Sequence, residues 1–324
     1  MVCAAIALAI LAPAQDAPVE LFRQFTAGKT LSYAVRSHLM TEQRQIGQPI
    51  FMPSELDINY DFTIDVKAIK TDGFADVVYK RPTMSIINGE TAESPPVENI
   101  EKTDYNLSMT ISPINEITNL KDLNAKPAEK PKPKTGGGSF KALLANPTPG
   151  AQMQLPGMEY IQEMYRLVLF TGSMDSSLDI SPKLPYEEVK KGDTWQRTVS
   201  YQPQKLKGKD GKSAVQRLDY TYTYDGLVTK DNVSYHQVTG TLKLDTDIAP
   251  FFNQMLGATE GMTGLKSMPL KLDSKVVFLL DEKTKNTVRA DAESSGGWGL
   301  VLTQLPDKFA IEEKIKGRTS LRLK

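Results

Sequence analysis

Hydrophobic and polar residues alternate one by one along much of the chain, most regularly from Leu56 to Val66. In this stretch the apolar residues Leu56, Ile58, Tyr60, Phe62, Ile64 and Val66 are separated by Asp57, Asn59, Asp61, Thr63 and Asp65. Because successive side chains of a strand point to opposite faces, this order predicts a strand with one apolar and one polar face. A strand of eleven residues at about 3.3 Å each reaches about 36 Å, which indicates a broad sheet rather than a small barrel.

Shorter stretches beside this strand repeat the alternation and are separated by turn residues. Residues 28–35 begin with a glycine and then alternate, and Asp72-Gly73 predicts a hairpin after the long strand, because Asp-Gly readily takes the positive φ that tight turns need. Residues 112–115, Ser-Pro-Ile-Asn, predict a second hairpin between the alternating residues of 105–120. We therefore expect residues 15–123 to form a first β lobe, a meander of antiparallel strands.

The middle of the chain differs in composition. Residues 124–139 interleave lysines with prolines and end in glycines and a serine, a mixture that cannot pack a core and predicts an exposed linker. Residues 140–184 are expected to hold a helical segment, because apolar residues from Met158 to Phe170 recur three and four positions apart.

The second half repeats the order of the first. Residues 192–199, 218–225 and 231–232 reproduce in turn the glycine-led strand, the long strand and the hairpin turn. Because alternation makes strands look alike, two versions of a mainly β fold stay open. One has two similar antiparallel β lobes, the second at 185–324, and the other has one large curved antiparallel sheet, in each case with a short helical segment packed on it. The final strand, 309–324, alternates apolar residues with charged ones that are mostly Lys and Arg. We expect these charges on the outer face, where they also discourage edge-to-edge association.

The N-terminus has the features of an export signal. Residues 2–11 are almost wholly apolar, and Ala12-Pro13-Ala14 places small residues at the two positions that a signal peptidase reads. The apolar run is shorter than the roughly 20 residues that span a bilayer. We therefore predict that residues 1–14 are a cleaved signal peptide and that the mature protein, without a transmembrane span, is periplasmic or secreted. A buried N-terminal helix is the alternative.

Composition narrows the choice of partners and cofactors. The chain of 324 residues has 39 basic and 39 acidic residues, so it lacks the positive excess of nucleic-acid-binding proteins and we expect no nucleic-acid partner. Its only cysteine, Cys3, lies in the predicted signal peptide, which leaves no thiol chemistry in the mature chain. Gly211-Lys212-Ser213 lacks the first glycine of a phosphate loop, and we expect no cofactor.

No catalytic or metal-binding arrangement is evident. The two histidines, His38 and His236, are far apart, and neither Gly-X-Ser-X-Gly nor His-Glu-X-X-His is present. Aspartates recur on the polar side of the long strand at intervals of about 7 Å, but calcium sites usually gather their ligands from a loop, so a solvated face is the simpler interpretation. We therefore expect a protein that is not an enzyme, and we name no catalytic, cofactor-binding or metal residue.

The segment most suggestive of binding runs from Ile248 to Leu270 and is rich in Met, Phe and Gly. Flexible thioethers and glycines make an adaptable apolar surface, which can line or cover a cavity for a hydrophobic ligand. A short helix and loop that close one end of the core are the simpler interpretation of the same residues. The candidate lining residues are Phe251, Phe252, Met255, Leu256 and Met262, together with Tyr165 from the predicted helix.

Two parts of the chain resemble a known family. Residues 28–79 resemble the first half of a family of exported bacterial β-rich envelope proteins of unknown function, and the Leu184-Pro185, Lys191-Gly192-Asp193 and Trp195 positions resemble the start of its second half. The resemblance implies a class and a location but no reaction. At the level of the fold alone, a large antiparallel sheet under a helix is also similar to the lipoprotein carriers of the envelope, which hold acyl chains in a concavity.

Three functions follow as hypotheses. The first is a non-enzymatic bacterial envelope protein that binds a lipid, another hydrophobic ligand or a partner on a concave sheet face. The second is a structural or interaction module that contacts another envelope protein. The third is an unrecognised hydrolase, which requires a cleft that brings a histidine or two carboxylates within hydrogen-bonding distance of a substrate.

Overall fold

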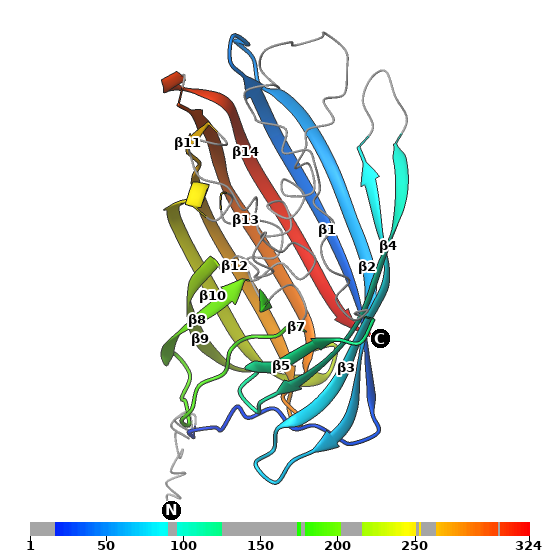
Figure 1. The fold of residues 1–324 in the computed structure, drawn as a ribbon. Helices are drawn as coiled ribbons and strands as arrows, with labels where there is room; N and C mark the ends of the chain where they lie inside the picture. Colours follow the sequence, from blue (N-terminus) through cyan, green and yellow to red (C-terminus); the bar gives the residue numbers. More distant parts are fainter. Residues whose placement is uncertain are drawn as a thin grey trace, which may run out of the picture.

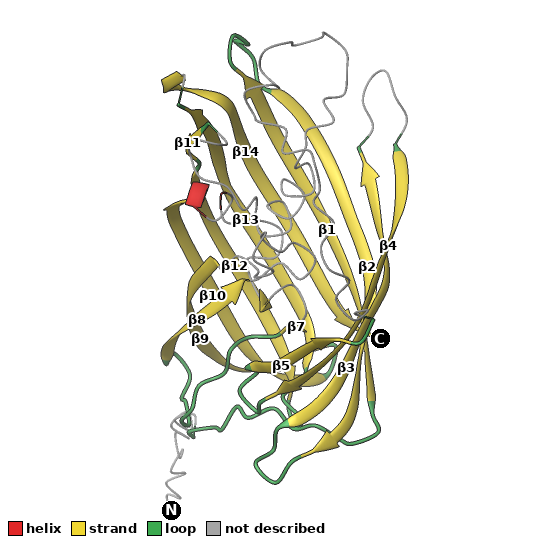
Figure 2. Cartoon of the chain, in the orientation of Figure 1, coloured by secondary structure: helices red, strands yellow, loops and turns green. Residues whose placement is uncertain are grey.

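Strands make up most of the chain that the structure describes. The computed structural model describes residues 17–89, 96–124, 174–175, 179–201, 216–250, 253, 264–303 and 305–324. The strands are β1 (Thr30–Gln45), β2 (Met52–Ile69), β3 (Ala75–Asn88), β4 (Val97–Ile111), β5 (Ile117–Asp122), β6 (Met174–Asp175), β7 (Asp179–Ile180), β8 (Thr194–Tyr201), β9 (Gln216–Lys230), β10 (Val233–Asp247), β11 (Leu265–Ser267), β12 (Pro269–Asp281), β13 (Thr287–Leu302) and β14 (Leu305–Leu323). Figure 2 shows how completely strands dominate these residues.

Twelve of these strands form one continuous antiparallel sheet. Its order is β5-β4-β3-β2-β1-β14-β13-β12-β10-β9-β8, with β11 paired to β13, while β6 and β7 pair only with each other. The two halves of the sequence join where β1 pairs with β14, from Tyr33 opposite Leu323 to Gln45 opposite Ile311. The mainly β prediction is confirmed, and the single large sheet is the version that forms. The predicted helix at Met158–Phe170 lies outside the described residues, as does the predicted linker beyond Asn124.

The central position of β14 corrects one expectation. Its basic side chains do lie on the polar face of the sheet, but β14 is flanked by β1 and β13 and has no open edge to protect. These charges instead pair with carboxylates on neighbouring strands, as Arg318 does with Glu293 at 3.5 Å.

The predicted hairpin turns form where the sequence places them. Gly73 has a φ of 80°, and the Phe74 amide donates to Oδ1 of Asp72 at 3.1 Å. Asp231 and Asn232 have φ values of 51° and 63°, as a two-residue turn that matches the twist of the strands requires.

The starts of β1 and β8 share one arrangement. Gly28 and Gly192 both have a positive φ, 77° and 92°. Their amides donate to Val66 O at 2.9 Å and to Tyr224 O at 2.7 Å, on the adjacent strands β2 and β9. The two strand starts therefore share a hydrogen bond as well as a glycine. An internal duplication stays a prediction.

The two faces of the sheet differ as the alternation requires. On β2, the side chains of Ile58, Tyr60, Phe62, Ile64 and Val66 are at most 3% exposed, whereas Asp61 between them is exposed. We call the apolar face the inner face and the polar one the outer face. The sheet curves so that the inner face lines a trough, with β1 and β12 to β14 as its floor and β2 to β5 and β8 to β10 as its two walls (Figure 1).

Two segments outside the sheet close one end of the trough, the end that is lower in Figure 1. We call residues 17–29 and 179–193 the end segments. They pair with each other through a bridge between Val19 and Val189. Leu184 donates its amide to Ile114 O at 3.1 Å, in the turn between β4 and β5, and Gln24 donates to Thr284 O at 2.7 Å, in the turn between β12 and β13. The end segments therefore connect the two sides of the trough.

The side chain of Arg23 is the centre of this connection. It is 2% exposed, and its guanidinium donates from Nε to Oδ1 of Asn286 at 2.7 Å and from Nη1 to Oδ1 of Asn115 at 3.1 Å. The amide of Asn115 in turn donates to Pro182 O at 2.7 Å. We call Arg23, Asn115 and Asn286 the polar latch.

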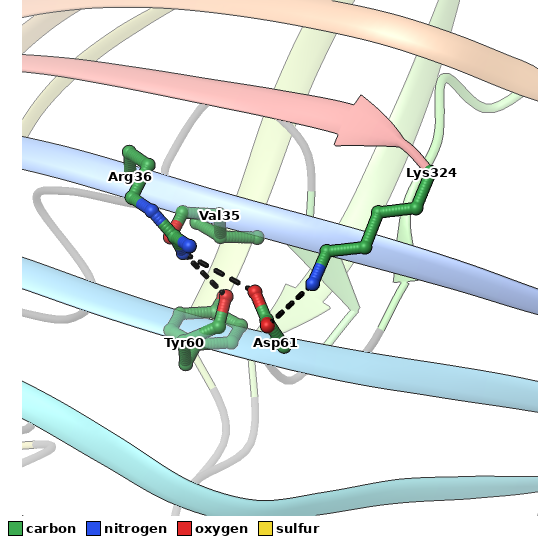
Figure 3. A network of polar contacts seen from close by, with 5 residues as sticks. All are labelled: Val35, Arg36, Tyr60, Asp61 and Lys324. Carbon is green, nitrogen blue, oxygen red and sulfur yellow. Dashed lines mark hydrogen bonds and ion pairs between the residues drawn. The ribbon is translucent and has the colours of Figure 1, made fainter.

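A network on the outer face ties the two halves of the sheet together (Figure 3). Lys324 donates to Oδ2 of Asp61 at 2.5 Å, reaching from the end of β14 across β1 to β2. Arg36 donates to Oδ1 of Asp61 at 3.3 Å and to the carbonyl oxygens of Val35 and Tyr60 at 2.7 and 3.2 Å. Burial raises the pKa of Asp61, but the hydrogen bonds and charges of Lys324 and Arg36 outweigh it and hold the pKa below its usual value.

Candidate functional site

The inner face of the trough is the candidate site, and its walls are aromatic. On one wall the Phe62 ring lies 5.0 Å from the Tyr33 ring at the edge of the floor and 5.2 Å from that of Tyr79. On the other wall the Tyr222 ring lies 5.7 Å from that of Trp195 and 5.8 Å from that of Tyr220. Aromatic side chains fill these positions because they suit a pleated surface and bury a large apolar area.

A band of small hydroxyl side chains crosses the floor between the walls. Thr319 on β14 donates its hydroxyl to Ser37 on β1 at 3.0 Å, and the hydroxyls of Ser274 on β12 and Ser294 on β13 lie 3.3 Å apart. These four side chains are 3 to 9% exposed. We call them the hydroxyl band. Small hydroxyl side chains therefore cross the floor as one band between the aromatic walls.

One charged side chain interrupts the first aromatic wall. Arg81 on β3 is 1% exposed, and its guanidinium lies 4.8 Å from the centre of the Tyr60 ring and 4.4 Å from that of Tyr105. Cation–π contacts of this kind satisfy the faces of a guanidinium and leave its edge to hydrogen bonds. The wall therefore holds a fixed positive charge inside an apolar surface.

His236 occupies the lower part of the opposite wall. It is 6% exposed, and its Nδ1 lies 2.7 Å from the Tyr224 hydroxyl, which donates to the neutral ring. Burial lowers the pKa of His236, and the nearby charge of Lys285 lowers it further, against a hydrogen bond to the Glu282 backbone that raises it. The pKa of Lys285 is itself lowered by burial. His236 is thus held neutral as part of the core.

The other histidine lies on the outer face. Nδ1 of His38 is 2.7 Å from Oδ1 of Asp57, and the two side chains are 42 and 46% exposed. They border an open groove of about 450 Å³ that Ser320 also lines, but within the described residues no hydrogen bond joins Ser320 to His38. Because His38 and His236 are on opposite faces of one sheet, they cannot act in one site.

The aspartates of the long strand pair with cations. Asp65 accepts hydrogen bonds from Lys80 at 3.0 Å and from Thr30 at 2.8 Å. Burial raises its pKa, but these hydrogen bonds and the charges of Lys80 and Lys67 lower it further than burial raises it. In the part of the chain that the structure describes, no cluster of three or more potential metal ligands occurs.

The candidate lining residues named from the sequence lie outside the described residues. This applies to Phe251, Phe252, Met255, Leu256, Met262 and Tyr165. The two ends of the segment that carries most of them are placed. Ile248 is 1% exposed and Met268 is 2% exposed, and the Ile248 amide donates to Met268 O at 3.0 Å. Oδ1 of Asp247 accepts from the amides of Ala249 and Met268, each at 2.8 Å. Both ends are therefore fixed at the upper part of the trough.

Sequence reasoning overlooked three inner-face residues that break the apolar pattern. Arg81 follows Val77 and Tyr79 in the inward register, and Glu313 shares the register of Ile311 and Ile315. Ser37 similarly follows Val35. A charged or hydroxyl residue at a position that alternation assigns to the core is the signal that would have revealed them.

Among the described residues, no helix is long and apolar enough to cross a membrane.

Comparisons with known proteins found matches among solved structures but not among family models or curated proteins. No family model matches it, and no curated protein does. Among solved structures it is similar to one of lipovitellin that describes lipid–protein interactions, with 11% identity over 93% of this chain and a TM-score of 0.40. It spans 25% of that chain. It is also similar to DynF from the dynemicin biosynthesis pathway of Micromonospora chersina, with 7% identity over 95% of this chain and 86% of that one and a TM-score of 0.23. A DUF1329 family protein from Desulfovibrio piger matches with 8% identity, over 90% of this chain and 85% of that one, and a TM-score of 0.14.

Proposed function

We propose that this protein is a non-enzymatic binding protein of the bacterial envelope that holds a lipid or another hydrophobic ligand against the inner face of its sheet. We expect it in the periplasm or outside the cell, because residues 1–14 have the composition of an export signal. The ligand lies along the trough, between the aromatic walls and over the hydroxyl band.

The distribution of side-chain size on the inner face carries this proposal. A sheet that only packs a core tends to alternate large and small side chains so that facing layers interdigitate. Here the aromatic stacks are on the walls, and Ser37, Ser274, Ser294 and Thr319 form a band of small side chains across a floor that also carries large residues such as Phe278 and Trp298. Small side chains between aromatic walls favour an apolar ligand at this band, because hydrophobic pockets bind mainly through apolar contact.

Ligand uptake has a structural cost that makes the proposal testable by kinetics. The hydroxyl band is already 3 to 9% exposed in the chain without ligand, so a ligand must displace the atoms that cover it. When binding needs a conformational change, the association rate constant falls below the usual range for protein association, roughly 10⁵ to 10⁷ M⁻¹s⁻¹. We therefore expect a rate constant for ligand association below about 10⁵ M⁻¹s⁻¹.

The first test is native mass spectrometry of the protein purified from its own envelope, followed by organic extraction and lipid analysis. A stoichiometric acyl-bearing adduct is the expected result. Delipidated protein should then take up fatty acids or phospholipids saturably, and an absence of saturable uptake would refute the proposal.

A pair of variants tests whether the ligand lies on the inner face. Ser294→Val adds volume to the floor and should weaken uptake, whereas Ser295→Val changes the neighbouring residue, which is exposed on the outer face, and should not. Equal uptake by both variants, with unchanged circular dichroism, would mean that the ligand lies elsewhere.

One observation favours the second candidate, an interaction module. In the described chain, β4 pairs with β5 only from Leu107 onward, so its first part is an edge, with Val97 51% and Ile100 69% exposed. Such edges accept a strand from a partner. A photo-crosslinker at Ile100 that captures one envelope protein in cells, while one at Thr241 does not, would support this role.

A further inference from the structure

The indole N–H of Trp298 is a buried donor for which the described residues supply no acceptor. Trp298 is 4% exposed, and among the described residues Nε1 has no hydrogen-bond partner. A buried donor that loses water without gaining a partner costs on the order of 1–3 kcal/mol. Native proteins contain few such groups, and each calls for an explanation such as a bound water or ligand.

The surroundings of Trp298 are apolar on one side and polar on the other. It lies on the inner face of β13, where Leu270 of β12 and Glu313 of β14 are its direct cross-strand neighbours. Leu270 is fully buried and Glu313 is 1% exposed. Direct neighbours on one face have Cβ atoms about 5 Å apart, so a group that reaches the indole N–H is also near this carboxyl group.

A glycine lets β13 lie close to β14 beside the indole. A Cβ added to Gly297 would lie 2.5 Å from Glu313 O. Real Cβ atoms do not approach backbone atoms so closely, so the two strands come this near at Gly297 only because it lacks a side chain. Trp298 therefore lies in a closely packed part of the sheet.

We propose that Trp298 is the polar anchor of the ligand site and that its indole N–H donates to the carbonyl oxygen of an ester or amide on an acyl ligand. This inference rests on the proposed function and specifies the ligand class. An indole only donates, so its partner must be an acceptor. A free carboxylate would bring a charge into this buried site, which desolvation disfavours, whereas a neutral carbonyl satisfies the donor without adding charge. The acyl chain then continues along the apolar side, over Leu270 and Leu272.

The test uses the two tryptophans of the chain. In the Trp195→Phe variant, Trp298 is the only indole, and an acyl ester brominated near its carbonyl should quench its fluorescence on binding. An ester brominated at the far end of the chain should quench less. Equal quenching by the two esters would overturn the placement of the carbonyl at Trp298.

A second measurement separates the hydrogen bond from apolar contact. Trp298→Phe keeps most of the ring and removes the donor, so it should weaken binding of an acyl methyl ester about three- to tenfold, the range for one hydrogen bond. It should change binding of the alkane of equal length far less, and Ser295→Val on the outer face should leave the preference for ester over alkane intact. If Trp298→Phe leaves that preference unchanged, the N–H holds a water only and the anchor is overturned while the proposed function stands. If neither ester nor alkane binds the native protein saturably, the proposed function fails, and the anchor fails with it.

Discussion

Replacement of Arg23 by methionine should destabilise the protein by about 3 kcal/mol. The guanidinium makes two hydrogen bonds, at 2.7 and 3.1 Å, to side chains of the polar latch, and a hydrogen bond from a charged donor contributes about 1.5–3 kcal/mol. Relief of the cost of burying the charge offsets part of that sum. Methionine fills a similar volume and is flexible, so the loss reports the hydrogen bonds rather than a cavity.

Urea unfolding monitored by far-ultraviolet circular dichroism and by tryptophan fluorescence measures this loss. Coincident transitions justify a two-state free energy. Arg23→Lys serves as the matched control, because an ammonium keeps the charge but cannot reach both amides in the fork geometry of a guanidinium, and it should recover at most half of the loss.

A double-mutant cycle with Asn286→Ala tests the assignment directly. Arg23 and Asn286 touch, so their effects should couple by at least about 1 kcal/mol. Additive effects, or a Met variant within about 0.5 kcal/mol of the native protein, would show that Arg23 does not hold the end segments in place.

Three further predictions address the sheet. Gly296→Ala would place a Cβ 2.1 Å from the Lys271 carbonyl oxygen, so it should force β12 and β13 apart. The loss of stability measured by thermal unfolding should exceed about 3 kcal/mol. The control Ser295→Ala on the outer face should change stability by less than about 0.5 kcal/mol. Burial and the charge of Lys285 lower the pKa of His236 in the folded protein. As the pH falls below 6.5, the unfolded chain therefore binds a proton before the folded protein does, and the free energy of unfolding should decline. In a pH titration of that free energy, His236→Asn should show a less steep decline. Asp61 has a lowered pKa despite its burial because Lys324 and Arg36 stabilise its charge, so its contribution is present above pH 3.8 and is lost as the pH falls further. Since these side chains are 47 to 52% exposed, Asp61→Asn should cost less than about 1 kcal/mol, and the difference should shrink in about 1 M salt.

The fold was predictable from the sequence as far as local rules reach. The alternation at Leu56–Val66 and the turn residues Asp72-Gly73 and Asp231-Asn232 identify strands and hairpins, because side-chain direction and positive φ are decided within a few residues. The pairing of β1 with β14 was not predictable in this way. The pairing depends on which two strand edges meet, and apolar and polar residues alternate in the same way at both edges.

The site was less predictable, because its properties come from several strands at once. Ser37, Ser294 and Thr319 are unremarkable along the chain and become one band only through the register of β1, β13 and β14. Trp298 and Leu300 alternate with glycines as apolar strand residues do, but the sequence alone does not reveal whether an indole N–H finds an acceptor. The segment chosen for its Met and Phe content stays untested as a lining, although both of its ends are fixed at the trough.

The seam between β1 and β14 has a consequence for the order of folding. Ser37 and Thr319, which hydrogen bond across it, are 282 positions apart, so β1 lacks one of its two neighbours until the residues of β14 have been synthesised. Contacts between such distant positions form slowly. A chain exported as we propose would benefit, because its central sheet cannot close while the chain is still emerging from the ribosome. The same delay leaves the edge of β1 open to other chains, so a holding chaperone should bind the precursor through β1 and release it once β14 is available.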